Sequence, residues 1–341
     1  RDKAFSHFLL FGLRVSDLTD AFTGNGPVVF DSTLAAEAVV TREPQETRID
    51  EIAALFEVDA GYLVASQKDA TILEFVSVPM IYSRESGRFD IISARAQFQE
   101  TGGVFDGTLG PEVRNGQAGL AFRLEAPRYR LAIPPEPRVG RTLQRTTANI
   151  ALDAFAPDDL PQIDLSSLEL AMGDVRVSYS GLLEMTERGP RVSAIAQSTP
   201  MRAVHLAAIW PLPMAPNARI WFLENVAEGQ IGEGSFWFSA YLNDIEVRDG
   251  RSFLDDEMMM VSIPFENAVM RTVGDLPPIF GVDGTATVTG RTVRTVGAGG
   301  VGRLPNGDAV TVRQAEFYIG DHAQPNPMAS LNLTLEGPVS A

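Results

Sequence analysis

The chain is dominated by apolar and polar side chains that alternate with a period of two. This alternation predicts β-strands that bury one face and leave the other in water. It is clearest in the segments 118–126, 175–185 and 331–336. Further strands are expected at 28–41, 88–98, 192–197, 235–242, 258–266, 282–296 and 309–319. Glycine, proline, asparagine and aspartate separate these segments, as turns between strands require. The sequence therefore predicts a mainly β protein.

Helical patterns are scarce along the chain. The segment 216–228 predicts a short helix, since Pro216 suits a first helical turn and Gly229 suits the position just past the last turn. A second short helix is expected at 48–56, where apolar residues recur at helical spacing. The class predicted from these patterns is β with a few short helices.

A proline-rich stretch from Pro127 to Pro137 predicts a joint between two parts. We expect an N-terminal β-rich section at 1–137 and a more orderly β section at 138–341. No strict repeat is visible, but one unit recurs loosely, a long amphipathic strand followed by a turn and another strand. Such units stabilise their apolar faces by stacking on their neighbours.

Long strands with one apolar face must cover that face with a second sheet, with helices or with a ligand. Helices are too scarce here, so two arrangements remain. One is a curved sheet whose apolar face lines a lipid groove, and the other is a closed β-sandwich, which composition alone favours. Trp210 and Trp221 lie around the helix at 216–228, and we expect them to dock it onto the sheet. Contact with a lipid or a partner protein is their alternative role.

Composition and charge exclude several classes of protein. The 341 residues include 28 Lys and Arg against 44 Asp and Glu, a net charge of −16, which argues against nucleic-acid binding. The absence of cysteine excludes disulfides, thiolate metal sites and a cysteine nucleophile. No apolar run of about 18 residues is present to span a bilayer as a helix. The chain opens on Arg1 without a signal-peptide pattern, and we expect it to be a section of a longer protein.

No motif predicts catalysis, a cofactor or a metal. The glycines from Gly297 to Gly302 match G-x-G-x-x-G, but a turn and a strand follow them where a dinucleotide site needs a helix. The acidic clusters 158–159 and 255–257 are expected to be solvated turns, because adjacent carboxylates on a strand point to opposite faces. His205 lies in a mostly apolar run and is expected to be structural.

Scattered residues in the second half of the chain form a recognisable order. They are 164–170, 175–181, 206–211, Ala218, Arg219, Trp221, Glu224, Asn225, Gly229, Ile231, 234–236, 277–279, Gly284 and Gly290. A Trp-Pro pair, then Ala-Arg-x-Trp in a short helix, then glycine and a strand, resembles the AsmA-like superfamily and its YhdP-type central domain. The resemblance covers about 160–341.

This resemblance implies an elongated, curved, taco-like antiparallel β-sheet groove built of stacked strand units. It also implies a location in the periplasm, with the parent protein anchored in the inner membrane of a Gram-negative envelope by a segment outside this chain. Such proteins carry phospholipids from the inner to the outer membrane without chemistry on them. The partners implied are phospholipids and, through the missing segments, the two membranes.

The leading hypothesis is therefore a periplasmic section of a bridge-like lipid-transport protein that is not an enzyme. Its apolar lining is expected to include Leu120, Phe122, Leu124, Val175, Val177, Tyr179, Leu183, Phe236, Phe238, Leu331, Leu333 and Leu335. A closed β-sandwich that serves as a structural or assembly module is the second hypothesis. A carbohydrate-active enzyme that uses one acidic cluster is the third.

Overall fold

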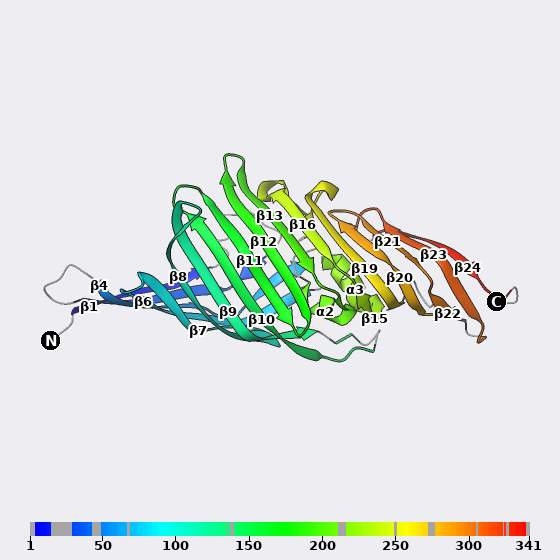
Figure 1. The fold of residues 1–341 in the computed structure, drawn as a ribbon, viewed down its shortest axis with the longest axis horizontal. Coiled ribbons are helices and arrows are strands. Elements are labelled where there is room, and N and C mark those ends of the chain that lie inside the picture. The colour runs from blue at the N-terminus through cyan, green and yellow to red at the C-terminus, as the bar shows by residue number, and fades with distance from the viewer. Residues whose placement is uncertain are drawn as a thin grey trace.

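The computed structural model describes a single long antiparallel sheet that curls along its length (Figure 1). The residues that it describes are 4–14, 29–42, 49–66, 69–133, 135–136, 140–210, 216–248, 251–271, 277–304, 306–322, 324 and 327–338. Among them, 22 strands form one sheet and two more form a separate hairpin. The predicted class, mainly β with an elongated, curved antiparallel sheet and a few short helices, is confirmed.

Most strands of the N-terminal part are long, and they pair with their neighbours in antiparallel register. They are β1 (Ala4–Arg14), β2 (Val29–Asp31), β3 (Thr33–Arg42), β4 (Ile49–Val58), β5 (Gly61–Ser66), β6 (Asp69–Ser83), β7 (Arg88–Phe98), β8 (Thr101–Arg114) and β9 (Gln117–Ile133). The sheet then continues through β10 (Gln144–Pro157), β11 (Gln162–Met172), β12 (Val175–Thr186) and β13 (Gly189–Ser198).

The C-terminal part has one short strand and two helices, and then returns to strands. These elements are β14 (Met201–Arg202), α2 (Ala203–Ile209), α3 (Pro216–Asn225), β15 (Val226–Ile231), β16 (Ser235–Tyr241), β17 (Glu246–Arg248), β18 (Arg251–Phe253), β19 (Met259–Met270), β20 (Ile279–Thr289), β21 (Val293–Ala298), β22 (Val301–Arg303), β23 (Ala309–Ile319) and β24 (Ala329–Glu336). Two single-turn 3-10 helices span Leu242–Asp244 and Asp256–Met258.

One sheet includes the first part of the predicted joint, residues 127–133. Pro127 lies inside β9, and β9 pairs with β10 as far as Ile133 opposite Gln144. The same sheet therefore continues, through β9 and β10, from the N-terminal strands to the C-terminal ones.

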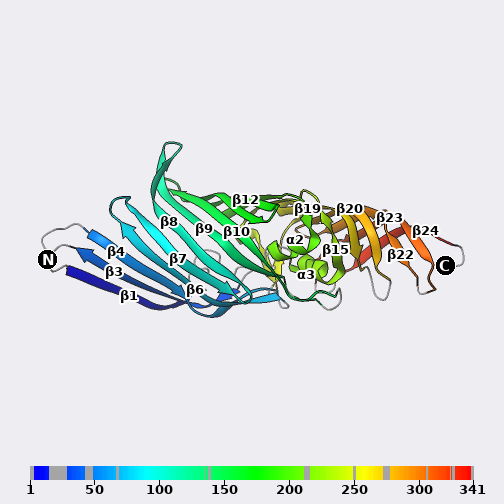
Figure 2. The ribbon, with the colours of Figure 1, turned by 60° about the horizontal axis from the view of Figure 1, so that its bottom comes forward.

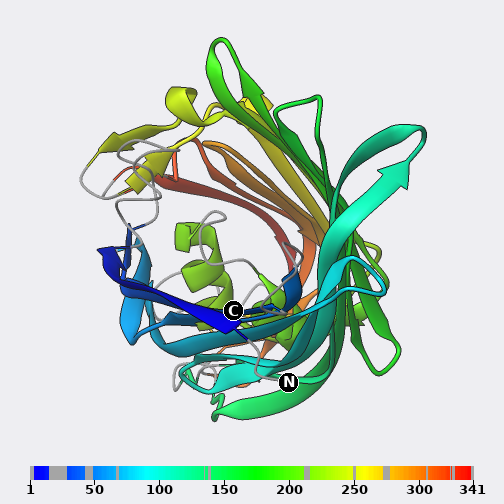
Figure 3. The same cartoon turned by 90° about the vertical axis from the view of Figure 1, so that its left-hand side faces the viewer.

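The two helices lie on the concave side of the sheet (Figures 2 and 3). Helix α2 packs against β9 and β15, and α3 packs against β15 and the N-terminal strand β5. The curl of the sheet thus brings β5 and β15, which are far apart in sequence, into contact with the same helix. Helix α3 buries Ala218, Phe222 and Leu223 in the core that these strands enclose, and Arg219 beside them is also buried.

The structure corrects two predicted helices. The helix expected at 48–56 is a strand from Ile49 onward, because β4 pairs with β3 on one side and with β6 on the other. The helix expected at 216–228 ends at Asn225, since the next residues pair with β19 as part of β15. Gly229, expected just beyond the helix, lies within that strand. The strand expected at 282–296 is two strands, β20 and β21, joined by a turn.

Two distant strand pairs share one bulge motif. In β7 the bulge lies between Ile91 and Ala94, and in β19 it lies between Phe265 and Ala268. Each bulge holds a residue with a positive φ, Ser93 at 56° or Asn267 at 50°. The opposite strand carries Asp-Gly-Thr in both places, at 106–108 and 283–285.

Hydrogen bonds and close packing explain that shared sequence. Asp106 accepts the amide of Ser93 at 2.8 Å, and Asp283 accepts the amide of Asn267 at 2.7 Å. The glycine that follows each aspartate is required, because a Cβ at Gly107 or at Gly284 would clash with a backbone carbonyl oxygen of the next strand. The two bulges therefore share both their sequence and their geometry.

Candidate functional site

The concave face of the sheet carries an apolar row between β9 and β24, called here the inner row. Residues directly opposite each other in antiparallel strands share a face. Tracing these pairs across the sheet gives Leu124, Leu152, Leu168, Tyr179, Ala196, Phe236, Val261, Val288, Val293, Ile319 and Ala329. No charged side chain interrupts this row. The face that contains it is called the inner face, and the opposite one the outer face.

All twelve residues expected to line a groove lie on the inner face. Phe122 and Leu120 precede Leu124 in alternation on β9, and Val175, Val177 and Leu183 alternate with Tyr179 on β12. Phe238 lies beside Phe236 on β16, and the three leucines of β24 pair with Phe317, Ala315 and Val312 of β23. The structure thus brings these residues to one surface, although Leu120 and Leu335 are half exposed near its ends.

Three cavities on this face are lined by residues that the structure describes. The largest, here the central cavity, has a volume of about 340 Å³ and lies between α3 and strands β15, β19, β20, β21 and β23. The α2 cavity, of about 60 Å³, is lined by Val177, Tyr179 and Phe236 together with residues of α2. The β24 cavity, also of about 60 Å³, is lined by Leu331 and Leu333. Five of the twelve predicted residues therefore line a cavity.

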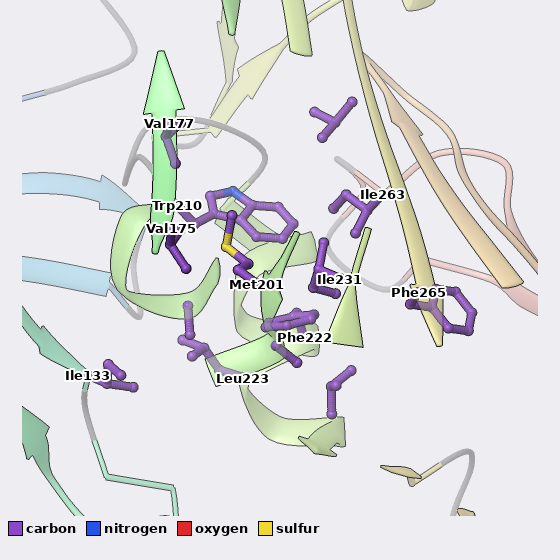
Figure 4. Packing of buried hydrophobic residues seen from close by; sticks show 14 of the residues in the cluster. Ile133, Val175, Val177, Met201, Trp210, Phe222, Leu223, Ile231, Ile263 and Phe265 are labelled. Carbon is purple, nitrogen blue, oxygen red and sulfur yellow. The ribbon is translucent and has the colours of Figure 1, made fainter. Parts of the chain in front are cut away.

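Aromatic side chains on and beside the two helices are shared between neighbouring cavities, and Figure 4 shows Trp210 packed among the buried apolar residues. Trp210, which follows α2, lines both the α2 cavity and the central cavity and packs on Phe222 with ring centroids 5.9 Å apart. Trp221 of α3 lines both the central and the β24 cavities and stacks on Phe317 of β23 at 5.4 Å. The expectation that these tryptophans dock the helix is confirmed. Pro211, the second residue of the predicted Trp-Pro pair, lies outside the described residues.

Burial makes the inner face a region of low dielectric. It raises the pKa of Tyr179 to about 12, and it also raises the pKa of Tyr129 on β9. Burial lowers the pKa of His322, which lines the central cavity, and outweighs the opposing hydrogen bond to the Thr289 carbonyl. These groups are therefore uncharged at neutral pH, and they add no charge to the apolar surface.

The outer face carries charge. Glu112 of β8 accepts hydrogen bonds from Arg114 and Arg123, each at 2.8 Å, and these bonds lower its pKa. Asp153 of β10 also bonds Arg114, whose guanidinium lies 5.1 Å from the ring centroid of Phe155. On β8 to β10 the charged groups therefore lie on the outer face, opposite the leucines of the inner row.

A buried arginine holds the end of α3. Arg141 is only 8% exposed, and its Nη2 donates to the carbonyls of Leu223 and Val226 at 2.9 and 3.1 Å. The last carbonyls of a helix have no hydrogen-bond partners within the helix. A cation at this end also stabilises the helix, because it lies at the negative end of the helix dipole. Arg141 therefore fixes α3 on the concave side of the sheet.

The acidic clusters lie away from the inner face. Asp158 and Asp159 are exposed in the turn between β10 and β11, as expected. Asp255 accepts a hydrogen bond from Arg291 at 2.8 Å. Asp256 accepts the hydroxyl of Thr289 and the backbone amides of Arg291 and Thr292. This second cluster ties one loop to another.

Those hydrogen bonds predict a pH-dependent contribution to stability. Partial burial opposes ionisation of Asp256, but the bonds from Thr289 and the two amides outweigh it and lower its pKa. The contribution is therefore complete above the pKa of the unfolded chain and is lost as pH falls toward the lower folded value. We expect Asp256→Asn to lower the free energy of unfolding by about 1 kcal/mol at neutral pH.

Thermal melts of both proteins from neutral to acid pH check this expectation. The difference between wild type and Asp256→Asn should shrink as pH falls. A difference that stays constant with pH would contradict the role given to the carboxylate.

The remaining sequence motifs are structural. Gly297 to Gly302 span the end of β21 and the start of β22, and a strand follows them, as expected. His205 is half-buried on α2, where burial and then the charge of Arg202 lower its pKa. Across the described ranges, no three His, Asp or Glu side chains come together in a way that would hold a metal ion. No helix in those ranges has the length and apolar character needed to cross a bilayer.

Sequence reasoning missed most of the lining of the central cavity. Its lining includes Ile231, Ile263, Phe265 and Phe317. The strands that contain the last three were expected, but their place in a cavity was not. Alternation within β19 and β23 could have placed these three on an apolar face. Their meeting around α3 depends on register between strands that lie far apart in sequence.

The fold and the site define a class, a curved antiparallel sheet with an apolar concave face. Comparison of the chain with protein-family models, with curated proteins and with solved structures finds no match.

Proposed function

We propose that this chain carries phospholipids along the inner face of its sheet, without chemistry on them. In this proposal it is a periplasmic section of a bridge-like protein that is anchored in the inner membrane and delivers lipid to the outer membrane. The observation that supports it most is the inner row, which is apolar in every strand that it crosses between β9 and β24. An acyl chain needs such a continuous lining, while its head group can stay in water.

The energetics of acyl chains agree with this proposal. Each buried methylene contributes roughly 0.8 kcal/mol, so an apolar face holds a chain without any polar motif. The low dielectric around Tyr179 fits the same use of the surface. The resemblance to the AsmA-like superfamily in 160–341 points in the same direction.

A closed structural module is the second candidate. It is favoured by one observation, the packing of α2 and α3 against the inner face around Trp210 and Phe222. In that case the helices complete an ordinary core, and the chain binds no lipid.

Native mass spectrometry and lipid extraction of the purified chain separate the two candidates. We expect phospholipid at about one or more molecules per chain, released by detergent, since the apolar face stabilises each acyl chain over many methylenes. A chain that folds and carries no lipid after incubation with phospholipid vesicles would contradict lipid carriage and favour the structural module.

A further inference from the structure

We propose that the central cavity is a discrete site for one acyl chain of a phospholipid, closed off from the rest of the inner face by Trp210 and Trp221. This inference rests on the proposed function and makes it more specific. The inner face is then divided into compartments, and a lipid pauses at a defined place along it.

The central cavity is enclosed enough to hold a chain. Its volume of about 340 Å³ falls within the range of small-molecule sites, roughly 300–1,000 Å³. Buried residues that include Phe222, Ile231, Ile263 and Phe265 form its wall.

The polar residues of the lining indicate which end of a lipid enters. Glu228, Gln230 and Gln324 are exposed, so they mark the opening of the cavity to water. Among the described residues, no Lys or Arg lines the cavity, and burial keeps His322 uncharged. An anionic head group would therefore find no cation in this lining, whereas an uncharged chain meets apolar side chains.

The two tryptophans form the boundaries of the site. Trp210 is shared with the α2 cavity, and Trp221 is shared with the β24 cavity. Both are held by ring contacts, Trp210 with Phe222 and Trp221 with Phe317. A chain that fills the central cavity must therefore touch both rings.

The chain has only three tryptophans, which supplies a direct test. The third, Trp237, lies on the outer face, where it pairs with the exposed residues Ile195 and Met260. We use three variants, each of which keeps one tryptophan and carries phenylalanine at the other two positions. The fluorescence of each variant then reports on one place only, either one of the two boundaries or the outer face. Bromine on an acyl chain quenches tryptophan fluorescence on contact.

The probe is a phosphatidylcholine brominated on its acyl chain, presented in vesicles. We expect quenching of Trp210 and of Trp221 to be several-fold stronger than quenching of Trp237. A brominated fatty acid, tested in parallel, distinguishes the two sources of an acyl chain. Stronger quenching by the phospholipid supports the proposal, and quenching by the fatty acid alone overturns the assignment to a phospholipid.

A filling variant tests the cavity itself. Ala286 lines the cavity from β20, and its neighbour Thr285 is exposed on the outer face. We expect Ala286→Phe to weaken lipid binding about tenfold, the loss that follows when about two methylenes are excluded. Thr285→Phe adds the same ring to the outer face and should leave binding unchanged.

Lipid content is measured by mass spectrometry on the same samples. This measurement separates the proposal of lipid carriage from the proposal of a discrete acyl-chain site. Bound lipid with equal quenching of all three tryptophans would overturn the discrete site and leave lipid carriage standing. Absence of bound lipid would overturn both.

Discussion

Two carboxylates placed on the inner face of β16 will abolish lipid loading. In Phe236→Asp/Phe238→Asp, an acyl chain that crosses this strand must contact both charges. Phe236 belongs to the inner row and lines the α2 cavity. A carboxylate desolvated without a partner costs several kcal/mol, so we expect bound phospholipid to fall by more than about tenfold. Lipid extraction and native mass spectrometry measure the loss.

The matched control lies on the opposite face of the same strand pair. Ile195→Asp/Ser239→Asp adds the same two charges to the outer face, where Ile195 is exposed and Arg191 already bonds Ser239 at 3.1 Å. This variant should bind lipid as the wild type does. Circular dichroism must find the β content of both variants intact. Equal lipid loading in the two folded variants would refute the assignment of the inner face.

The second large effect is expected at Arg141. Arg141→Met leaves the carbonyls of Leu223 and Val226 without their charged donor, and it removes a cation from the negative end of α3. Hydrogen bonds to charged groups stabilise the fold by roughly 1.5–3 kcal/mol. The buried Nη1 of Arg141 has no hydrogen-bond partner among the described residues, and the cost of burying it offsets part of that stabilisation. We expect a net loss of about 2 kcal/mol.

Urea unfolding followed by fluorescence measures this loss, and hydrogen exchange of the α3 amides locates it. Arg141→Lys serves as the comparison, because an ammonium keeps the charge but lacks the planar fork of a guanidinium. Its stability should lie between those of wild type and Arg141→Met. Unchanged exchange in α3 of the methionine variant would contradict the capping role.

The strands and their faces could be predicted because a period of two is a local property of the sequence. The alternation in 331–336 placed Leu331 and Leu333 together, and the structure keeps them on one face. The prediction for the segment 48–56 was wrong for a related reason. Its apolar residues fit helical spacing as well as a strand, and pairing with β3 and β6 decides between them.

The cavities could not be predicted in the same way. Trp221 meets Phe317 only because α3 docks against β23, which begins far along the chain. Likewise, Arg141 reaches Leu223 across a large separation in sequence. No local pattern encodes such contacts. The sequence therefore predicts the apolar face of each strand, and the folded chain determines where that face is left uncovered.

The shared bulge motif of β7 and β19 has a consequence for how such a sheet lengthens. Asp106 and Asp283 hold matching kinks in distant parts of the sheet, with Ala94 and Ala268 buried beside them. A hairpin that carries its own kink fits onto a copy of itself with its apolar side in the same orientation. Duplication of one gene segment would thus add length and leave the cross-section unchanged, so the span of the protein is a quantity that evolution can adjust in whole hairpins.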